Sequence, residues 1–330
     1  FTNKLNTGSV KLMKSTNTGA NLSGWQIGIY TDAACSNAVS GSSFTTGADG
    51  TVTAAGLQKG TYYAKEIPTD DPFWEFDTAV KSVTVAVGQT AEVTFTNTHY
   101  GRIEFRKTTN TGNQLGGWTF RVRDSEGNSY GDFTTDDNGY ACTENLPLGR
   151  YTVVELPTED NYWLTELGFH DVTVKAGETT VDTWLNKEQG LAWFYKKTNT
   201  GQSVEGWHIT VYSDEACTQK VGTLITNADG KAGYYLDPGT YWAKETGDEH
   251  GRFEDEYWMV DETVQRFEIK PHEDVSITFT NVQYVSLRVV NTRTYTLPKT
   301  GSSGLCLFPV FALIPTFTCS SGLALSILRK

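Results

Sequence analysis

The sequence predicts an all-β protein built from small sandwich domains in tandem. Short runs of alternating apolar and polar residues are broken by turn signals roughly every 8 to 12 residues, as in β-sandwich domains. The string Thr-Asn-Thr-Gly recurs at residues 16–19, 109–112 and 198–201. This interval of about 90 residues is the size of a small independent domain. No stretch before residue 297 carries a sustained helical period.

Repeated markers set the expected domain limits. Residues 8–100, 101–189 and 190–285, here called domains one, two and three, each hold one copy of every marker. Phe1-Thr2-Asn3 matches Phe95-Thr96-Asn97, so residues 1–7 are expected to end a truncated upstream domain. Residues 286–296 are expected to form a linker, and residues 297–330 a separate C-terminal segment.

Three strand positions recur in every domain. In domain one, Val10, Leu12 and Lys14 share a face of the opening strand, because side chains alternate between the two faces. The same alternation puts Glu66 on the apolar face of a middle strand and Asn97 on that of the closing strand. The equivalent residues are Lys107, Glu155 and Asn186 in domain two, and Lys196, Glu245 and Asn281 in domain three.

Two further sequence motifs recur at equivalent positions relative to these strands. A Gly-Trp pair follows the opening strand, and a turn ending in Asp-Gly or Asn-Gly precedes the middle strand. The pairs end at Trp25, Trp118 and Trp207, and the turns end at Gly50, Gly139 and Gly230. Domain two is the less regular copy, because Asp182 and Trp184 precede Asn186 on the predicted apolar face.

An amine, a carboxyl group and a carboxamide that are buried together can react. Burial favours the neutral forms, so the pKa values of lysine and glutamate move toward each other. The free amine can attack the asparagine side chain while the protonated glutamate polarises the carbonyl and relays protons to the departing ammonia. We expect one amide cross-link per domain, formed in a single turnover and not by an enzyme. The alternative is a buried ion pair, which is a weak source of stability.

The residues also carry a family resemblance. The lysine before a Thr-Gly turn, the Gly-Thr-Tyr segment that leads to the glutamate, and the closing Thr-Phe-Thr-Asn resemble the Cna protein B-type domain, also called the SpaA-like pilin domain, of Gram-positive surface proteins. This resemblance implies an immunoglobulin-like β-sandwich whose first and last strands are neighbours. It also implies that the three lysines are nucleophiles, the three glutamates proton relays and the three asparagines acceptors in isopeptide bonds.

The C-terminal segment carries an independent motif. Leu297, Pro298, Lys299, Thr300 and Gly301 precede a mainly apolar stretch and a final Arg-Lys pair. This order resembles a cell-wall sorting signal, in which sortase cuts between Thr300 and Gly301 and joins Thr300 to an amine of a peptidoglycan precursor or a pilin subunit. The apolar stretch would lie in the membrane before that step, and an ordinary membrane anchor is the alternative. Either way, the domains are expected outside the cell. If the motif is a sorting signal, sortase would attach them covalently to the wall.

Composition excludes several other functions. A net charge of −12 argues against nucleic-acid binding. No cofactor or metal site is expected, because the five histidines show no metal-ligand spacing and no phosphate-binding glycine loop occurs. The five cysteines do not form a disulfide framework.

The predicted function is therefore a structural stalk whose domains are stapled by isopeptide bonds. We expect the lysine and asparagine to lie near the two ends of a domain, so that tension crosses the bond and bypasses the loop between them. The absence of a Tyr-Pro-Lys string favours a wall-anchored protein or minor pilin over a pilus shaft subunit. A second hypothesis is an adhesin for a host matrix protein or glycan, which would use the aromatic residues Trp74, Trp163 and Trp258 if they are exposed. These tryptophans could instead cover the ends of the sandwiches.

Overall fold

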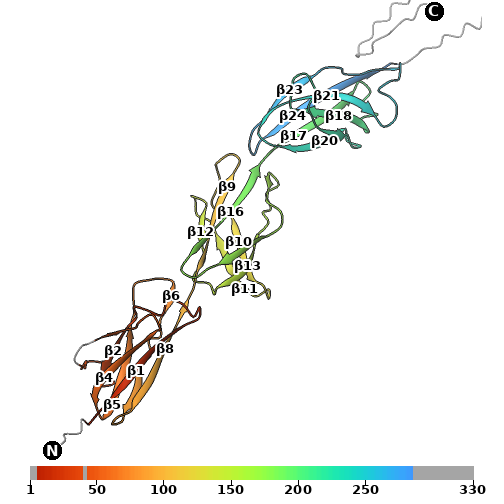
Figure 1. The fold of residues 1–330 in the computed structure, drawn as a ribbon. Helices are drawn as coiled ribbons and strands as arrows, with labels where there is room; N and C mark the ends of the chain where they lie inside the picture. Colours follow the sequence, from red (N-terminus) through yellow and green to blue (C-terminus); the bar gives the residue numbers. More distant parts are fainter. Residues whose placement is uncertain (1–5, 40–42, 285–330) are drawn as a thin grey trace, which may run out of the picture. The chain divides into compact units, whose positions relative to one another are not determined.

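The computed structural model describes residues 6–39 and 43–284. Within these ranges every regular element is a β-strand, which confirms the predicted all-β fold class. Each domain consists of two four-stranded sheets formed by a continuous stretch of chain (Figure 1). The linker and the Leu297–Gly301 motif lie outside the described residues. None of the described residues belongs to a helix that could cross a membrane.

In domain one, the first sheet has the strand order β4-β1-β8-β6 and the second β3-β2-β5-β7. The opening and closing strands are therefore central neighbours in one sheet, as the family resemblance implies. The eight strands are β1 (Thr7–Thr16), β2 (Gln26–Tyr30), β3 (Phe44–Thr45), β4 (Thr51–Gln58), β5 (Gly60–Ile67), β6 (Trp74–Glu75), β7 (Lys81–Val85) and β8 (Thr90–His99).

Domain two repeats this topology, with the orders β12-β9-β16-β14 and β11-β10-β13-β15. Its opening strand is β9 and its closing strand β16, which again pair in parallel. The strands are β9 (Arg102–Thr109), β10 (Thr119–Asp124), β11 (Ser129–Thr134), β12 (Tyr140–Cys142), β13 (Gly149–Glu155), β14 (Trp163–Leu164), β15 (His170–Val174) and β16 (Thr179–Glu188).

Domain three has the orders β20-β17-β24-β22 and β19-β18-β21-β23. The opening strand β17 pairs in parallel with the closing strand β24. The strands are β17 (Gly190–Thr198), β18 (Trp207–Tyr212), β19 (Lys220–Ile225), β20 (Lys231–Leu236), β21 (Gly239–Asp248), β22 (Trp258–Met259), β23 (Gln265–Ile269) and β24 (Asp274–Gln283).

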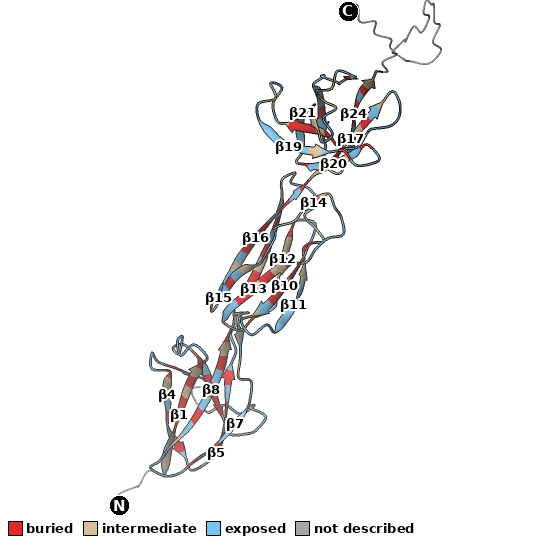
Figure 2. Cartoon of the chain, turned by 90° about the vertical axis from the view of Figure 1, so that its right-hand side faces the viewer, coloured by how far each residue is buried: buried red, intermediate tan, exposed pale blue. Residues whose placement is uncertain are grey.

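The core of each domain lies between its two sheets. In domain one, Leu12 and Phe95 from the first sheet pack in one buried cluster with Ile27, Ile29 and Ala64 from the second. Buried and exposed residues alternate along the strands (Figure 2). This alternation is the period of two that the sequence shows, and it directs the marked lysines, glutamates and asparagines inward.

The Thr-Asn-Thr-Gly strings form turns that tie the opening strand to the closing strand. Asn17 Nδ2 donates to the carbonyl of His99 at 3.0 Å, and Asn17 Oδ1 accepts from the amide of the same residue at 2.8 Å. Asn199 makes the same pair of hydrogen bonds to Gln283 in domain three. The repeated asparagine therefore continues the pairing between the two strands beyond the end of the sheet.

Candidate cross-linking sites

Parallel pairing brings each marked lysine beside its asparagine. In domain one, Lys14 is opposite Phe95 and Thr16 is opposite Asn97, so both side chains lie near the C-terminal ends of β1 and β8. The same register joins Lys107 and Asn186 in domain two. Our expectation that lysine and asparagine occupy the two ends of a domain is wrong, because two parallel neighbouring strands end on the same side.

All nine marked residues are buried. The lysine and glutamate side chains are at most 2% exposed in each domain, and the three asparagines, Asn97, Asn186 and Asn281, are fully buried. Charged side chains are almost never this buried unless they are paired. The sequence pattern therefore predicted the burial of all three residue types correctly.

In domain one the carboxylate of Glu66 lies between the other two groups. Lys14 Nζ donates to Glu66 Oε1 at 2.8 Å and to Oε2 at 3.0 Å. Asn97 Nδ2 donates to the same Oε1 at 2.9 Å. One carboxylate oxygen thus contacts both the amine that would attack and the nitrogen that would leave, which suits a proton relay.

Domain two has the same arrangement, although its closing strand is less regular. Lys107 Nζ donates to Glu155 Oε1 at 2.6 Å, and Asn186 Nδ2 donates to that oxygen at 3.1 Å. The irregular residues are accommodated by hydrogen bonds. Asp182 accepts from Trp184 Nε1 at 2.8 Å and contacts His170 Nδ1 at 2.7 Å.

Domain three shows one difference. Lys196 Nζ contacts Glu245 Oε1 as in the other copies. Among the described residues, however, Asn281 Nδ2 has no hydrogen-bond partner, although the carboxamide is close enough to Glu245 to affect the pKa of that residue. The amine and carboxyl group are therefore paired in all three domains, whereas the contact from the carboxamide nitrogen to the glutamate is made in domains one and two.

The asparagine carbonyl is bound by the main chain and not by the glutamate. Asn97 Oδ1 accepts from the amide nitrogen of Asp77 at 2.8 Å. Glu166 and Asp261 supply the equivalent amides, at 3.0 Å to Asn186 and 2.7 Å to Asn281. The expectation that the glutamate polarises this carbonyl is therefore wrong for this geometry, because its carboxylate faces the carboxamide nitrogen in domains one and two.

The tryptophan of each Gly-Trp pair covers the lysine amine. The Nζ atoms of Lys14, Lys107 and Lys196 lie 4.3, 4.6 and 4.4 Å from the ring centroids of Trp25, Trp118 and Trp207. A second tryptophan packs edge-on against the first in domain one, with ring centroids 5.0 Å apart for Trp25 and Trp74. The aromatic cover excludes water from the amine.

The Gly-terminated turns fix the backbone of the lysine. Lys14 N donates to the carbonyl of Gly50 at 2.8 Å, and Gly139 and Gly230 bind Lys107 and Lys196 in the same way. Gly50 has a φ of +71°, and a Cβ atom there would lie 3.0 Å from the carbonyl oxygen of Lys14. Glycine is required for both reasons, so the turn marker belongs to the same site as the lysine.

Burial lowers the pKa of all three marked lysines. Desolvation lowers the pKa of Lys14 and of Lys107, although the adjacent glutamates favour the charged amine. Desolvation lowers the pKa of Lys196 to about 8. It also raises the pKa of Glu245, against the opposing effect of Lys196. In domain three the two pKa values therefore move toward each other, which favours a neutral amine beside a protonated carboxyl group.

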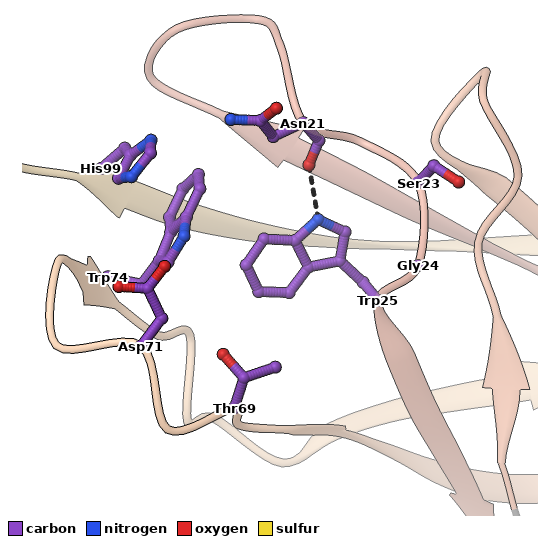
Figure 3. A pocket seen from close by; sticks show the side chains of 8 residues that line it. All are labelled: Asn21, Ser23, Gly24, Trp25, Thr69, Asp71, Trp74 and His99. Carbon is purple, nitrogen blue, oxygen red and sulfur yellow. Dashed lines mark hydrogen bonds between the residues drawn. The ribbon is translucent and has the colours of Figure 1, made fainter. Parts of the chain in front are cut away.

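Domain one has a pocket of about 320 Å³ at the edge of its tryptophan pair (Figure 3). Trp25 Nε1 donates to the carbonyl of Asn21 at 2.6 Å, and the ring of His99 stacks on Trp74 with centroids 3.8 Å apart. Trp74 is half-buried. Trp163 and Trp258 are only 9% and 8% exposed, so these two cover their sandwiches and are not exposed as the adhesin hypothesis requires.

Sequence reasoning missed the residues that bind the asparagine carbonyl. Asp77, Glu166 and Asp261 each lie 20 residues before their asparagine. They also each follow a tryptophan by three positions. That constant spacing of an acidic residue was the available signal. No group of three or more histidine, cysteine or acidic side chains suited to a metal occurs in residues 6–39 and 43–284.

The three copies define a class of protein, namely tandem β-sandwich domains with a buried lysine, glutamate and asparagine between parallel first and last strands. The chain belongs to the SpaA prealbumin-like fold domain family, whose model matches residues 8–99, 101–188 and 193–283. This match confirms the resemblance to SpaA-like domains. No curated protein sequence gave a significant match.

The chain resembles several solved structures, including two pilins. The TIE protein of Bacillus anthracis is 25% identical, with a TM-score of 0.36, over 84% of this chain and 51% of that one. A streptococcal ancillary pilin is 16% identical, with a TM-score of 0.31, over 82% and 98% of the two chains. BcpA, the major pilin of Bacillus cereus, is 12% identical, with a TM-score of 0.36, over 84% and 99%.

Proposed function

We propose that this chain is a stalk segment of a Gram-positive surface protein or minor pilin, in which each domain is stapled by a Lys–Asn isopeptide bond. The observation that carries the proposal is the buried lysine, glutamate and asparagine, present in three copies with the glutamate against the amine. A buried ion pair alone would be a weak reason for such a costly arrangement.

The proposed reaction balances within the three side chains. Neutral Lys14 Nζ attacks Asn97 Cγ, a carbon–nitrogen bond forms, and the carbonyl electron pair moves onto Oδ1. A proton passes from Nζ to Nδ2 through Glu66, the electron pair on Oδ1 returns to the carbonyl, and ammonia leaves as the bond from Cγ to Nδ2 breaks. The products are one amide and one ammonia, and Glu66 ends in its starting protonation state.

The position of the bond explains its mechanical value. Tension that enters at the start of β1 would pass along that strand to Lys14, cross to Asn97 and leave at the end of β8. The 82 residues between them (15–96) would carry little load. In the chain-entropy model, closing a loop of this size stabilises the folded domain by roughly 4 to 5 kcal/mol.

The same proposal includes attachment to the cell wall. Sortase would cut after Thr300 and join it to an amine of a peptidoglycan precursor or pilin subunit, leaving the domains outside the cell. The support is the order of the motif, the apolar stretch and the basic pair in the sequence. The chain would act as structure and not as an enzyme, because each site reacts once.

An adhesive role is a second candidate, and it is favoured only in domain one. Trp74 is half-buried beside Asp71 and His99 in the pocket of Figure 3, and aromatic rings with nearby polar groups are typical of ligand sites. Binding of a host matrix protein or glycan that Trp74→Ala abolishes would support this role.

Intact-mass measurement on the full chain tests the stalk proposal. We expect a deficit of three ammonia masses, with cross-linked peptides that join Lys14 to Asn97, Lys107 to Asn186 and Lys196 to Asn281. Glu66→Gln is the matched control, because it keeps the shape of the site but removes the proton relay, and we expect it to restore one ammonia mass. Recovery of all six residues as unmodified side chains in folded protein would contradict the proposal.

A further inference from the structure

An acidic residue without a role in the proton relay lies beside each acceptor asparagine. These residues, Asp77, Glu166 and Asp261, are in the segment between the short strand that carries the second tryptophan and the next strand of the other sheet. Each contacts the closing strand at two points. The two contacts come from different parts of the same residue, namely its side chain and its main-chain amide.

The side chain of each acidic residue binds the closing strand one residue before the asparagine. Asp77 Oδ2 accepts from the amide of Thr96 at 3.2 Å. The same bond joins Glu166 Oε2 to the amide of Leu185 at 3.1 Å, and Asp261 Oδ2 to the amide of Thr280 at 3.1 Å. An aspartate and a longer glutamate thus reach the same backbone position, which shows that the contact is specific.

The main-chain amide of the acidic residue binds the asparagine itself. Because an N–H group can only donate, the amide of Asp77 fixes Asn97 Oδ1 toward itself at 2.8 Å. This orientation turns Asn97 Nδ2 toward Glu66, at 2.9 Å. The amide therefore selects the one orientation of the carboxamide in which the leaving nitrogen faces the proton relay.

Negative charge develops on Oδ1 when the lysine attacks. A donor that is already aimed at this oxygen stabilises the tetrahedral intermediate without having to reorganise, as in the oxyanion holes of acyl-transfer enzymes. Burial strengthens the effect, because Asn97, Asn186 and Asn281 are shielded from water.

We propose that the main-chain amides of Asp77, Glu166 and Asp261 are the oxyanion donors of the three cross-linking reactions, and that their carboxylates are positioning groups that hold those amides in place. This inference rests on the proposed isopeptide chemistry. It assigns carbonyl activation to the main chain and leaves the buried glutamate as the proton relay. No proton passes through the acidic residue, and the electron pair on Oδ1 returns to the carbonyl when ammonia departs.

Electrostatics argue against a simpler role for these carboxylates. A negative charge near the lysine favours the charged amine, and Asp77, Glu166 and Asp261 all act in this direction on their lysines. The charged amine cannot attack. The carboxylates thus oppose activation of the nucleophile, so their benefit to the reaction must come from where they hold the backbone.

Domain two offers the sharpest test, because Glu166→Gln is nearly isosteric. The introduced carboxamide can still accept from the amide of Leu185 and keeps a polar group beside His170 Nε2, which Glu166 contacts at 3.2 Å. Glu166→Ala removes both contacts. The full chain would be made by cell-free synthesis, and the Lys107–Asn186 cross-linked peptide followed over time. The rates of cross-linking in domains one and three of the same chain serve as internal references.

We expect Glu166→Ala to slow cross-linking in domain two by about tenfold or more, relative to the other two domains, and Glu166→Gln to restore most of the rate. The pH profile separates loss of a positioned donor from loosening of the site. Loss of the donor lowers the maximum rate of cross-linking. It does not shift to higher pH the part of the profile in which the rate rises as Lys107 loses its proton, here called the lysine limb. A loosened site rehydrates Lys107, whose pKa then rises toward its ordinary value, and the limb moves to higher pH.

Three outcomes would overturn the inference. Equal rates for Glu166→Ala and the wild type, with all three bonds formed, would overturn it and leave the stalk proposal intact. A slow variant with its lysine limb moved to higher pH would show only a loosened site. Absence of every cross-link in the wild type would overturn both proposals. If domain two of Glu166→Ala does not fold, Asp261→Ala in domain three provides the same comparison.

Discussion

Domains one and two reach the same site with different closing strands. In domain one the inward side chains before Asn97 are Val93 and Phe95, whereas in domain two the equivalent positions before Asn186 are Asp182 and Trp184. Both strands bring the lysine within hydrogen-bond distance of the glutamate, at 2.8 and 2.6 Å. The site therefore depends on register and on satisfied polar groups more than on an uninterrupted apolar face.

The polar residues at this site in domain two contact one another in a network, which joins Asp182 to Trp184, His170 and Glu166. Asp182 is 7% exposed, and its two oxygens contact Trp184 Nε1 and His170 Nδ1. The ring of His170 stacks on Trp184, with centroids 3.8 Å apart, and its other nitrogen contacts Glu166. A buried carboxylate is tolerated here because each oxygen has a partner.

Removing an acceptor asparagine should give the largest effect and tests whether the two domains are equivalent. We expect Asn186→Ala and Asn97→Ala each to restore one ammonia mass and to destabilise their own domain by roughly 4 to 5 kcal/mol, because each bond closes a loop of similar length. Intact mass and thermal unfolding measure the two effects. A much smaller loss in domain two would show that its irregular strand prevents complete reaction in the wild type.

The polar group of domain two predicts the next largest effect. Asp182→Val introduces the residue found in domain one, but it leaves Trp184 Nε1 buried without an acceptor. We expect a loss of about 1 to 3 kcal/mol in the free energy of unfolding of domain two.

Two controls sharpen that measurement. Asp182→Asn keeps an acceptor for Trp184 Nε1 and should cost less. The double variant Asp182→Val with Trp184→Phe removes donor and acceptor together and should recover part of the loss. Equal stability of Asp182→Val and the wild type would show that the group contributes nothing to domain two.

Histidine at position 170 should make domain two lose stability with rising pH, whereas the lowered pKa of the buried His99 in domain one acts in the opposite direction. Burial lowers the pKa of His170, but its contacts with Asp182 and Glu166 outweigh burial and raise the pKa above its ordinary value. A raised pKa stabilises the folded state fully below the unfolded value of about 6.5, and this stabilisation is lost as pH rises through the folded pKa.

We therefore expect the unfolding temperature of domain two to fall as pH rises above the unfolded value of about 6.5, with no matching fall in domain one, where Lys81 occupies the equivalent position. Thermal unfolding across this range measures the difference. His170→Lys is the matched control and should remove it. A rise in stability of domain two over the same interval would contradict the assignment of partners to His170.

The contrast between strands and connecting segments also explains what the sequence could predict. Strand alternation is local, so the inward positions of Lys14, Glu66 and Asn97 followed from a period of two. The contact between the Asp77 amide and Asn97 depends on how a segment without any period folds over the end of the sandwich. For the same reason, the burial of Trp163 and Trp258 could not be decided from their neighbours in sequence.

The smallest effect is expected where the domains differ at the surface of the site. Lys81 Nζ donates to Asp77 Oδ2 at 2.6 Å and to the carbonyl of Thr94. Gln265 replaces it in domain three and keeps only the second contact, to the carbonyl of Thr278 at 2.8 Å. The ion pair is thus the part that domain three lacks. Asp261 of that domain nevertheless holds its amide on Asn281 at 2.7 Å.

We therefore expect Lys81→Gln to change the stability of domain one by less than about 1 kcal/mol, because its side chain is partly exposed and such ion pairs contribute little. The rate of cross-linking in domain one should also stay near that of the wild type. Desolvation is the main effect that lowers the pKa of Lys14, and the charge of Lys81 is a smaller one, so Lys81→Gln removes only the smaller effect. Unfolding and the time course of the Lys14–Asn97 peptide measure both quantities. A large fall in that rate would show that Asp77 needs its ion pair to hold the amide, and that domains one and three position their donors by different means.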